Sequence, residues 1–161
     1  MGVHDFAFAG IRGGEIALRS YAGRPLMIVN TASKCGFTPQ YADLQTLWQR
    51  FRDRGLGLIG VPSSDFMNLE LPTEAEIERF VVKVFGIDFP LTAKQRVTGA
   101  EAHPFYRWLV EGREPPIAPR WNFHKILLSP EGEVAGVWPC GVSPNADAVT
   151  GAIERFRVPA H

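Results

Sequence analysis

Hydrophobic and polar residues follow two kinds of pattern along the chain. Residues 25–29 and 56–62 are short apolar runs, which is typical of strands buried on both faces. Between them, apolar residues from Tyr41 to Phe51 recur with the period of a helix, and Gly55 follows as the expected residue after its end. Two strands joined by one helix predict a right-handed parallel crossover.

Two further pairs of segments predict antiparallel hairpins. The first pair, residues 5–11 and 15–21, flanks a glycine turn, and the second, residues 123–128 and 134–138, flanks a Ser-Pro-Glu-Gly turn. The second pair alternates apolar and other residues, as expected when one face of a strand is buried.

Three more helices are expected. Thr73 followed by Glu76 has the pattern of a capping box, so a helix should run from there to about Phe85. The other two are expected over residues 103–109 and 143–156.

The order of these elements predicts an α/β protein with a thioredoxin-like fold. It would have an N-terminal β-hairpin and a central mixed sheet flanked by helices, in a single domain spanning residues 1–161. Other α/β folds share this order. The thioredoxin redox motif C-x-x-C is absent, because Thr38 stands where its second cysteine would be.

Charge and composition narrow the choice of partner. The chain has 17 basic and 17 acidic residues and no run of like charge, so neither a nucleic acid nor an anionic membrane surface is an expected partner. No apolar stretch is long enough to cross a membrane, and residues 1–18 lack the pattern of a leader. A cytoplasmic protein that binds a small molecule or another protein is the expectation.

The cysteines and histidines do not form a metal-binding pattern. Cys35 and Cys140 lie far apart, and the histidines are equally scattered, so no metal is expected. A structural disulfide is also not expected in a reducing compartment. Redox chemistry and simple packing remain as roles for the two thiols.

Cys35 is the candidate nucleophile. It follows the apolar run 25–29 and precedes a helix for which Thr38 is the expected N-cap and Pro39 the first residue. In that place unpaired backbone N–H groups, the positive end of the helix dipole and the neighbouring Lys34 would all favour the reactive thiolate.

The alternative for Cys35 is an inert buried thiol, because free cysteine is among the most buried residue types. Two observations favour reactivity. Ser33, Lys34 and Gly36 are unusual neighbours for a core cysteine, and the corner between a strand end and a helix is where open α/β sheets hold their sites.

The sequence around Cys35 resembles the signature of the glutathione peroxidase family. The resemblance covers nearly the whole chain, through residues 29–41, 60–66, 89–94, 102–109 and 121–125. It implies a cysteine-containing, non-selenium peroxidase with a thioredoxin-like fold. Such an enzyme reduces hydrogen peroxide and organic or lipid hydroperoxides with thiols, and the co-substrate would be glutathione or another thiol, with no bound cofactor.

The resemblance also assigns catalytic roles. Cys35 matches the peroxidatic residue, Trp121 the family's tryptophan and Asn122 its asparagine. An indole N–H and an amide NH₂ can stabilise first the thiolate and then the charge on the departing oxygen. Without Cys35, Trp121 and Asn122 could equally be a core aromatic residue and a turn amide.

One departure from the family lies between the second predicted strand and the next helix. Leu69 stands where the family has its catalytic glutamine. The neighbouring Asn68 is a possible substitute donor if its amide turns inward; a solvated loop asparagine is the alternative. Loss of one preorganised donor costs about a hundredfold to a thousandfold in rate.

A second departure concerns the reduction of oxidised Cys35. Members that use thioredoxin carry a resolving cysteine in the helix after Thr73, and Val81 takes its place here. The sulfenic acid would then need an external thiol, either glutathione or a thioredoxin-like partner, or Cys140 as an unusual resolving residue.

The chain is also short between Gly112 and Trp121, which resembles the monomeric members of the family. Lys34 and Lys125 are candidates for attracting an anionic thiol, with solvated charges as the alternative. The second functional hypothesis is a weakened family member that acts as a peroxide sensor or as a thiol-redox binding module.

Overall fold

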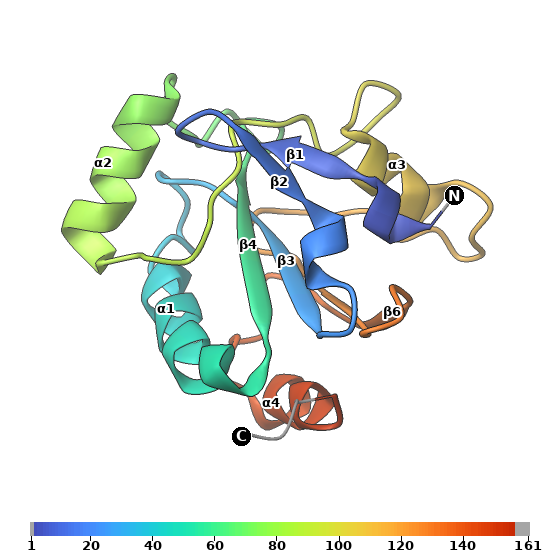
Figure 1. Cartoon of the computed structure of the whole chain (residues 1–161). Helices are drawn as coiled ribbons and strands as arrows, with labels where there is room; N and C mark the ends of the chain where they lie inside the picture. Colours follow the sequence, from blue (N-terminus) through green and yellow to red (C-terminus); the bar gives the residue numbers. More distant parts are fainter. Residues whose placement is uncertain (1, 157–161) are drawn as a thin grey trace.

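The structure, a computed structural model, describes residues 2–156 and centres on a four-stranded sheet in the order β4, β3, β5, β6 (Figure 1). The strands are β3 (Leu26–Thr31), β4 (Gly57–Pro62), β5 (Lys125–Leu128) and β6 (Val134–Trp138). β3 pairs with β4 in parallel, whereas its pairing with β5 and the pairing of β5 with β6 are antiparallel. The predicted mixed sheet and parallel crossover are confirmed.

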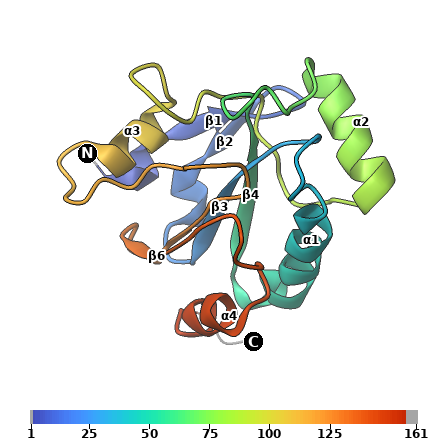
Figure 2. The same ribbon diagram turned by 180° about the vertical axis from the view of Figure 1, so that it is seen from behind.

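Helices and a small second sheet cover the two faces of this sheet (Figures 1 and 2). They are the hairpin β1 (Ala7–Ala9) and β2 (Glu15–Ala17), the helices α1 (Gln40–Phe51), α2 (Glu74–Phe85), α3 (Pro104–Val110) and α4 (Asp147–Glu154), and the 3-10 helices η1 (Val3–Asp5), η2 (Leu18–Tyr21) and η3 (Arg52–Arg54). Both hairpin strands are shorter than predicted.

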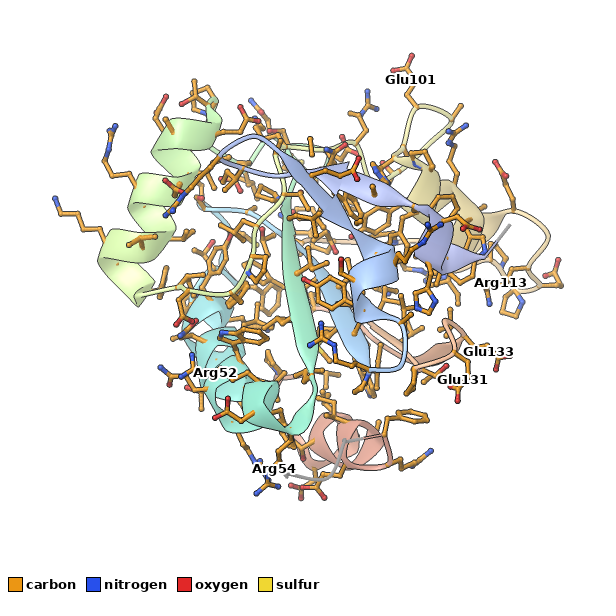
Figure 3. The ribbon with its side chains drawn as sticks, in the orientation of Figure 1. Arg52, Arg54, Glu101, Arg113, Glu131 and Glu133 are labelled. Carbon is orange, nitrogen blue, oxygen red and sulfur yellow. The ribbon has the colours of Figure 1, made fainter. Side chains whose placement is uncertain are left out.

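The sheet divides the hydrophobic core into two clusters. Met27 and Val29 of β3 pack in a cluster with residues of α1, α2 and α4, whereas Leu26 and Ile28 pack in a second cluster with the hairpin side and α3. Every residue of β3 and of β4 is buried, as their apolar runs predict. Exposed charges of both signs, among them Arg54, point away from the sheet (Figure 3).

Three connecting segments of the chain meet at one end of the sheet. β4 runs parallel to β3, and β5 begins opposite Val29 near the end of β3. The chain leaving β3, the chain leaving β4 and the chain entering β5 therefore meet at that end, as both ribbon views show.

Thr73 is the N-cap of α2, as predicted, but the starts of two other helices differ from the prediction. Thr73 Oγ1 accepts the N–H of Glu76 at 3.2 Å. The predicted start of α1 was wrong because the Thr38 hydroxyl accepts the N–H of Cys35 at 2.9 Å and donates to the carbonyl of Ala32 at 2.8 Å. It holds the turn before the helix, which starts at Gln40. α4 likewise starts later than predicted.

His103 caps α3 in its neutral form. Its Nδ1 accepts the N–H of Phe105 at 3.1 Å, its Nε2 lies 2.8 Å from the carbonyl of Ala7, and its ring stacks on Phe8. With Nδ1 as acceptor, Nε2 must carry the proton. Burial lowers the pKa of His103, opposed by the Ala7 carbonyl and assisted by the charge of Arg107.

We therefore expect stability to fall as the pH drops below about 6.5, because the unfolded chain then binds a proton that the folded His103 resists. The variant His103→Asn keeps a capping side chain that does not titrate. Urea unfolding between pH 5 and pH 8 should show that its free energy of unfolding depends less on pH than that of the parent. Equal pH dependence would contradict this role, and His4→Asn is the control at a histidine outside the helix cap.

Candidate active site

The turn after β3 holds Cys35 close to the surface. Its side chain is buried, with only 8% of the residue exposed. Phe37 donates its backbone N–H to the Cys35 Sγ at 3.4 Å, and Thr38 donates its own N–H to the carbonyl of Cys35 at 3.0 Å. An N–H aimed at sulfur stabilises a thiolate, so the turn supplies one of the donors that the sequence predicts.

Asn30 fixes the segment that carries the other two predicted residues. Its Nδ2 donates to the carbonyl of Trp121 at 2.9 Å, and its Oδ1 accepts the N–H of His124 at 3.2 Å. Phe123 completes the junction with a left-handed backbone (φ 66°), donating its N–H to the carbonyl of Asn30 at 2.6 Å. Asn30 was not among the residues predicted from the sequence, although a polar residue near the end of an apolar strand was a usable signal.

These bonds place Trp121 and Asn122 at the end of the sheet where Cys35 lies. Trp121 is half-buried, packs its ring at a tilt of 52° against Phe66 and lies on the hydrophobic cluster that contains Cys35. Asn122 is fully buried, and neither atom of its amide has a hydrogen-bond partner among residues 2–156. A buried amide with unused donors can bind an incoming oxygen without first breaking a bond within the protein.

Asn68 does not replace the missing glutamine. It is exposed, and both Met67 and Asn68 have left-handed backbones. Leu69 instead packs its half-buried side chain on the cluster that contains Cys35, and its carbonyl accepts the N–H of Lys34 at 2.9 Å. The prediction of an inward Asn68 amide was therefore wrong, and the glutamine position is apolar.

Lys125 is not available to bind an anionic thiol, so that prediction was also wrong. It lies in β5 between β3 and β6 and is fully buried. Its Nζ donates to the carbonyls of Pro139 at 3.4 Å and Cys140 at 3.3 Å. Burial lowers the pKa of Lys125 to about 8, opposed by Cys140 and Asp43. Lys34, in contrast, is exposed and keeps its predicted role as a proposal.

Cys140 lies near the first turn of α1. It is half-buried, and its carbonyl accepts the Nε2 of Gln40, the first residue of that helix, at 2.6 Å. Cys35 and Cys140 are both free thiols. The resolving role of Cys140 stays a prediction.

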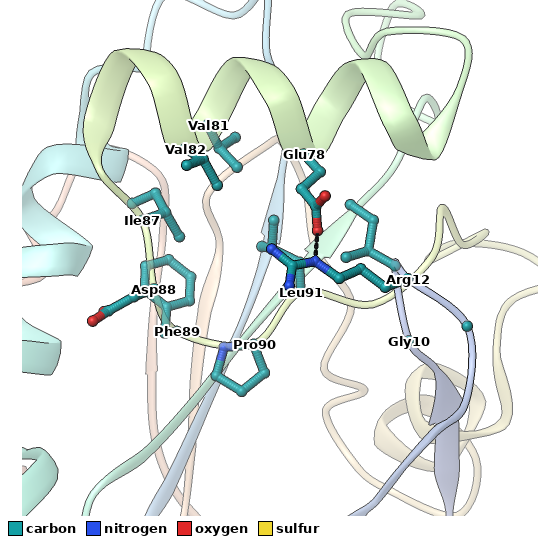
Figure 4. A pocket seen from close by; sticks show the side chains of 12 residues that line it. Gly10, Arg12, Glu78, Val81, Val82, Ile87, Asp88, Phe89, Pro90 and Leu91 are labelled. Atoms are coloured by element: carbon teal, nitrogen blue, oxygen red, sulfur yellow. Dashed lines mark hydrogen bonds and ion pairs between the residues drawn. The ribbon is translucent and has the colours of Figure 1, made fainter.

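A cavity of about 500 Å³ lies between α2, the β1–β2 turn and residues 87–91, and Arg12 pairs with Glu78 at its edge (Figure 4). Cys35 is not among the residues that line it.

Within residues 2–156 no cluster of three histidine, cysteine, aspartate or glutamate side chains could hold a metal, and His161 lies outside the described residues.

Comparison with known proteins identifies the relatives of this chain. A profile of the family described as glutathione peroxidase matches residues 3–110. The glutathione peroxidase homologue BsaA of Halalkalibacterium halodurans is 40% identical over 146 residues, covering 89% of this chain and 93% of that protein. The hydroperoxy fatty acid reductase gpx1 of Synechocystis sp. is 36% identical over 162 residues, covering 96% and 95%.

Solved structures share the fold. The crystal structure of Trgpx in its apo form has a TM-score of 0.73 and 29% identity, and the match covers 99% of each chain. A thiol:disulfide interchange protein of the thioredoxin family from Chlorobium tepidum has a TM-score of 0.67 at 16% identity, covering 97% of this chain and 95% of that one. This second likeness concerns the fold alone, and it confirms the predicted thioredoxin-like fold.

Proposed function

Since this chain belongs to the glutathione peroxidase family and is therefore a thiol-dependent peroxidase, we propose that Cys35 is the thiol that attacks the peroxide. The observation that carries the proposal is the meeting of two groups at one end of the sheet. Cys35 receives the N–H of Phe37 on its sulfur, and the unused, buried amide of Asn122 is fixed at the same end through Asn30.

The chemistry follows from these groups. The Cys35 thiolate attacks one oxygen of the hydroperoxide, an S–O bond forms and the O–O bond breaks, so the sulfur is oxidised to a sulfenic acid and the peroxide is reduced. The departing oxygen leaves as hydroxide or alkoxide and takes up a proton to give water or an alcohol. Trp121 and Asn122 are the donors proposed to stabilise its charge.

An external thiol is proposed to restore Cys35. One thiol, either glutathione or that of a thioredoxin-like partner, attacks the sulfenic sulfur and releases water, leaving a mixed disulfide. A second thiol then displaces Cys35 and leaves with the first as a disulfide. α2 has Val81 at the position of the family's resolving cysteine, and Lys34 is the exposed charge proposed to attract an anionic thiol.

The preferred substrate is proposed to be an organic or lipid hydroperoxide. Phe37, Leu69, Leu71 and Trp121 are half-buried on the cluster that contains Cys35, and Met67 nearby in the sequence is 76% exposed. An apolar rim favours a substrate that can bury hydrocarbon against it. The name of the hydroperoxy fatty acid reductase of Synechocystis sp. points the same way.

The enzyme is further proposed to act as a single-domain monomer in the cytoplasm, with no cofactor besides the thiol co-substrate. Its short connection before Trp121 and its balanced charge support this. Among the helices in residues 2–156, none is both long enough and apolar enough to cross a membrane.

The proposal is tested by mixing the reduced protein with peroxides in a stopped-flow instrument. We expect a fatty acid hydroperoxide to oxidise Cys35 about tenfold or more faster than hydrogen peroxide, because burying a few methylene groups is worth roughly 1–3 kcal/mol. Peptide mass spectrometry with added glutathione should find a mixed disulfide at Cys35.

Two results would change the proposal. A disulfide between Cys35 and Cys140, absent in Cys140→Ser, would make Cys140 the resolving residue. Oxidation of Cys35 no faster than that of a free thiol would favour the second hypothesis, a weakened member that senses peroxide or binds a redox partner.

A further inference from the structure

Several buried polar groups gather beneath the turn that carries Cys35. Glu70 is only 3% exposed, and Thr31, Ser33 and Tyr41 are also buried. The hydroxyls of these three residues and the Oε2 atom of Glu70 have no hydrogen-bond partner among residues 2–156. The groups come from the end of β3, the turn, α1 and the loop after β4.

Glu70 links two loops. Its Oε1 accepts the N–H of Ser33 at 3.2 Å and the N–H of Leu71 at 2.8 Å. Beside this bridge, Lys34 donates its N–H to the carbonyl of Leu69. One carboxyl oxygen thus joins the turn that carries Cys35 to the loop that carries Leu69 at the glutamine position.

Burial affects the pKa of Glu70 more than its positively charged neighbour does. The groups that face it are Tyr41 on α1, Ser33 in the turn and Lys94, whose Nζ donates to the carbonyl of Leu71 at 2.9 Å. Burial raises the pKa of Glu70. This effect is opposed first by the nearby Ser33 side chain, although that hydroxyl forms no hydrogen bond with the carboxyl, then by the Leu71 N–H and then by Lys94. The raised pKa favours the neutral carboxyl, and ionisation would place a negative charge beside the turn that carries Cys35.

We propose that Glu70 is a positioning residue for Cys35, which holds the turn in place through Ser33 and lowers the reactivity of the thiol when its own carboxyl ionises. This rests on Cys35 being the reactive thiol. Alkylation of Cys35 by iodoacetamide reports its ionisation without peroxide turnover, so a failure here is distinguishable from a failure of the peroxidase proposal.

The test of charge is the pH dependence of alkylation at Cys35, read by peptide mass spectrometry, in the parent and in Glu70→Gln. The amide keeps an acceptor for both N–H groups but cannot ionise. We expect Glu70→Gln to be alkylated about threefold to tenfold faster than the parent at the pH values where the parent's Glu70 is ionised. Superimposable profiles would overturn the proposal, and Glu131→Gln on the exposed β5–β6 turn is the matched control.

The test of positioning is the rate of peroxide reduction in Glu70→Ala, which removes the bridge as well as the charge. We expect at least about a tenfold loss, restored in Glu70→Gln to within about threefold of the parent. A parent-like Glu70→Ala would overturn the proposal. On the unsubstituted protein, infrared spectroscopy should show a carboxylic acid band that persists above the ordinary pKa of a glutamate, about 4.3, and the absence of this band would also overturn the proposal.

Discussion

Replacing Cys35 by serine is expected to lower the rate of peroxide reduction by at least about a thousandfold. The serine hydroxyl is not ionised near neutral pH and is a far weaker nucleophile than a thiolate. Its oxygen can still accept the N–H of Phe37, and Thr38 still holds the turn, so the fold should persist. The measurement is hydroperoxide consumption with glutathione as the reductant, together with the thermal unfolding midpoint of both proteins.

The matched control for this variant is Cys140→Ser, the same exchange at the other free thiol of the described chain. If an external thiol restores Cys35, the control should keep activity within about twofold of the parent. A Cys35→Ser protein that still reduces peroxide at a comparable rate would show that the chemistry lies elsewhere.

Leu69→Gln is expected to raise the rate with hydrogen peroxide by about a hundredfold to a thousandfold, the range that one preorganised donor contributes. Leu69 already packs on the cluster around Cys35, and its carbonyl is fixed by Lys34. A glutamine side chain at this position would therefore bring an amide N–H close to the reacting oxygens. The measurement is the rate constant of Cys35 oxidation by hydrogen peroxide and by a fatty acid hydroperoxide.

The same variant should reduce the preference for the fatty acid hydroperoxide, because an amide replaces part of the apolar rim. Leu69→Met, which keeps the position apolar, is the control and should behave like the parent. A Leu69→Gln protein no faster than Leu69→Met would show that the loop holds this side chain away from the reacting oxygens.

The sequence was sufficient for the strands, most helices and the position of Cys35, because these depend on local periodicity and on turn residues. It was insufficient for Lys125. Alternation along residues 123–128 suggested a strand with one exposed face, but β5 lies between β3 and β6 and is buried on both faces. Only the order of the strands in the sheet reveals that.

Asn68 and Glu70 illustrate a second limit. Asn68 is exposed and has a left-handed backbone, which asparagine adopts more often than most residues but which the local sequence did not predict here. Glu70 bonds to Ser33 across 37 positions of sequence, so its partner is visible only in the folded chain. The available signal was an acidic residue between Leu69 and Leu71, where a charge has no evident reason to lie.

The buried amide of Asn122 has a consequence for evolution. A polar side chain without partners in the core destabilises the folded state by about 1–3 kcal/mol, a noticeable share of the margin that keeps a domain of this size folded. Selection for stability alone would replace Asn122 with an apolar residue of similar volume. Under the proposed role of Asn122 in the reaction, its presence means that selection for turnover has outweighed selection for stability at this position.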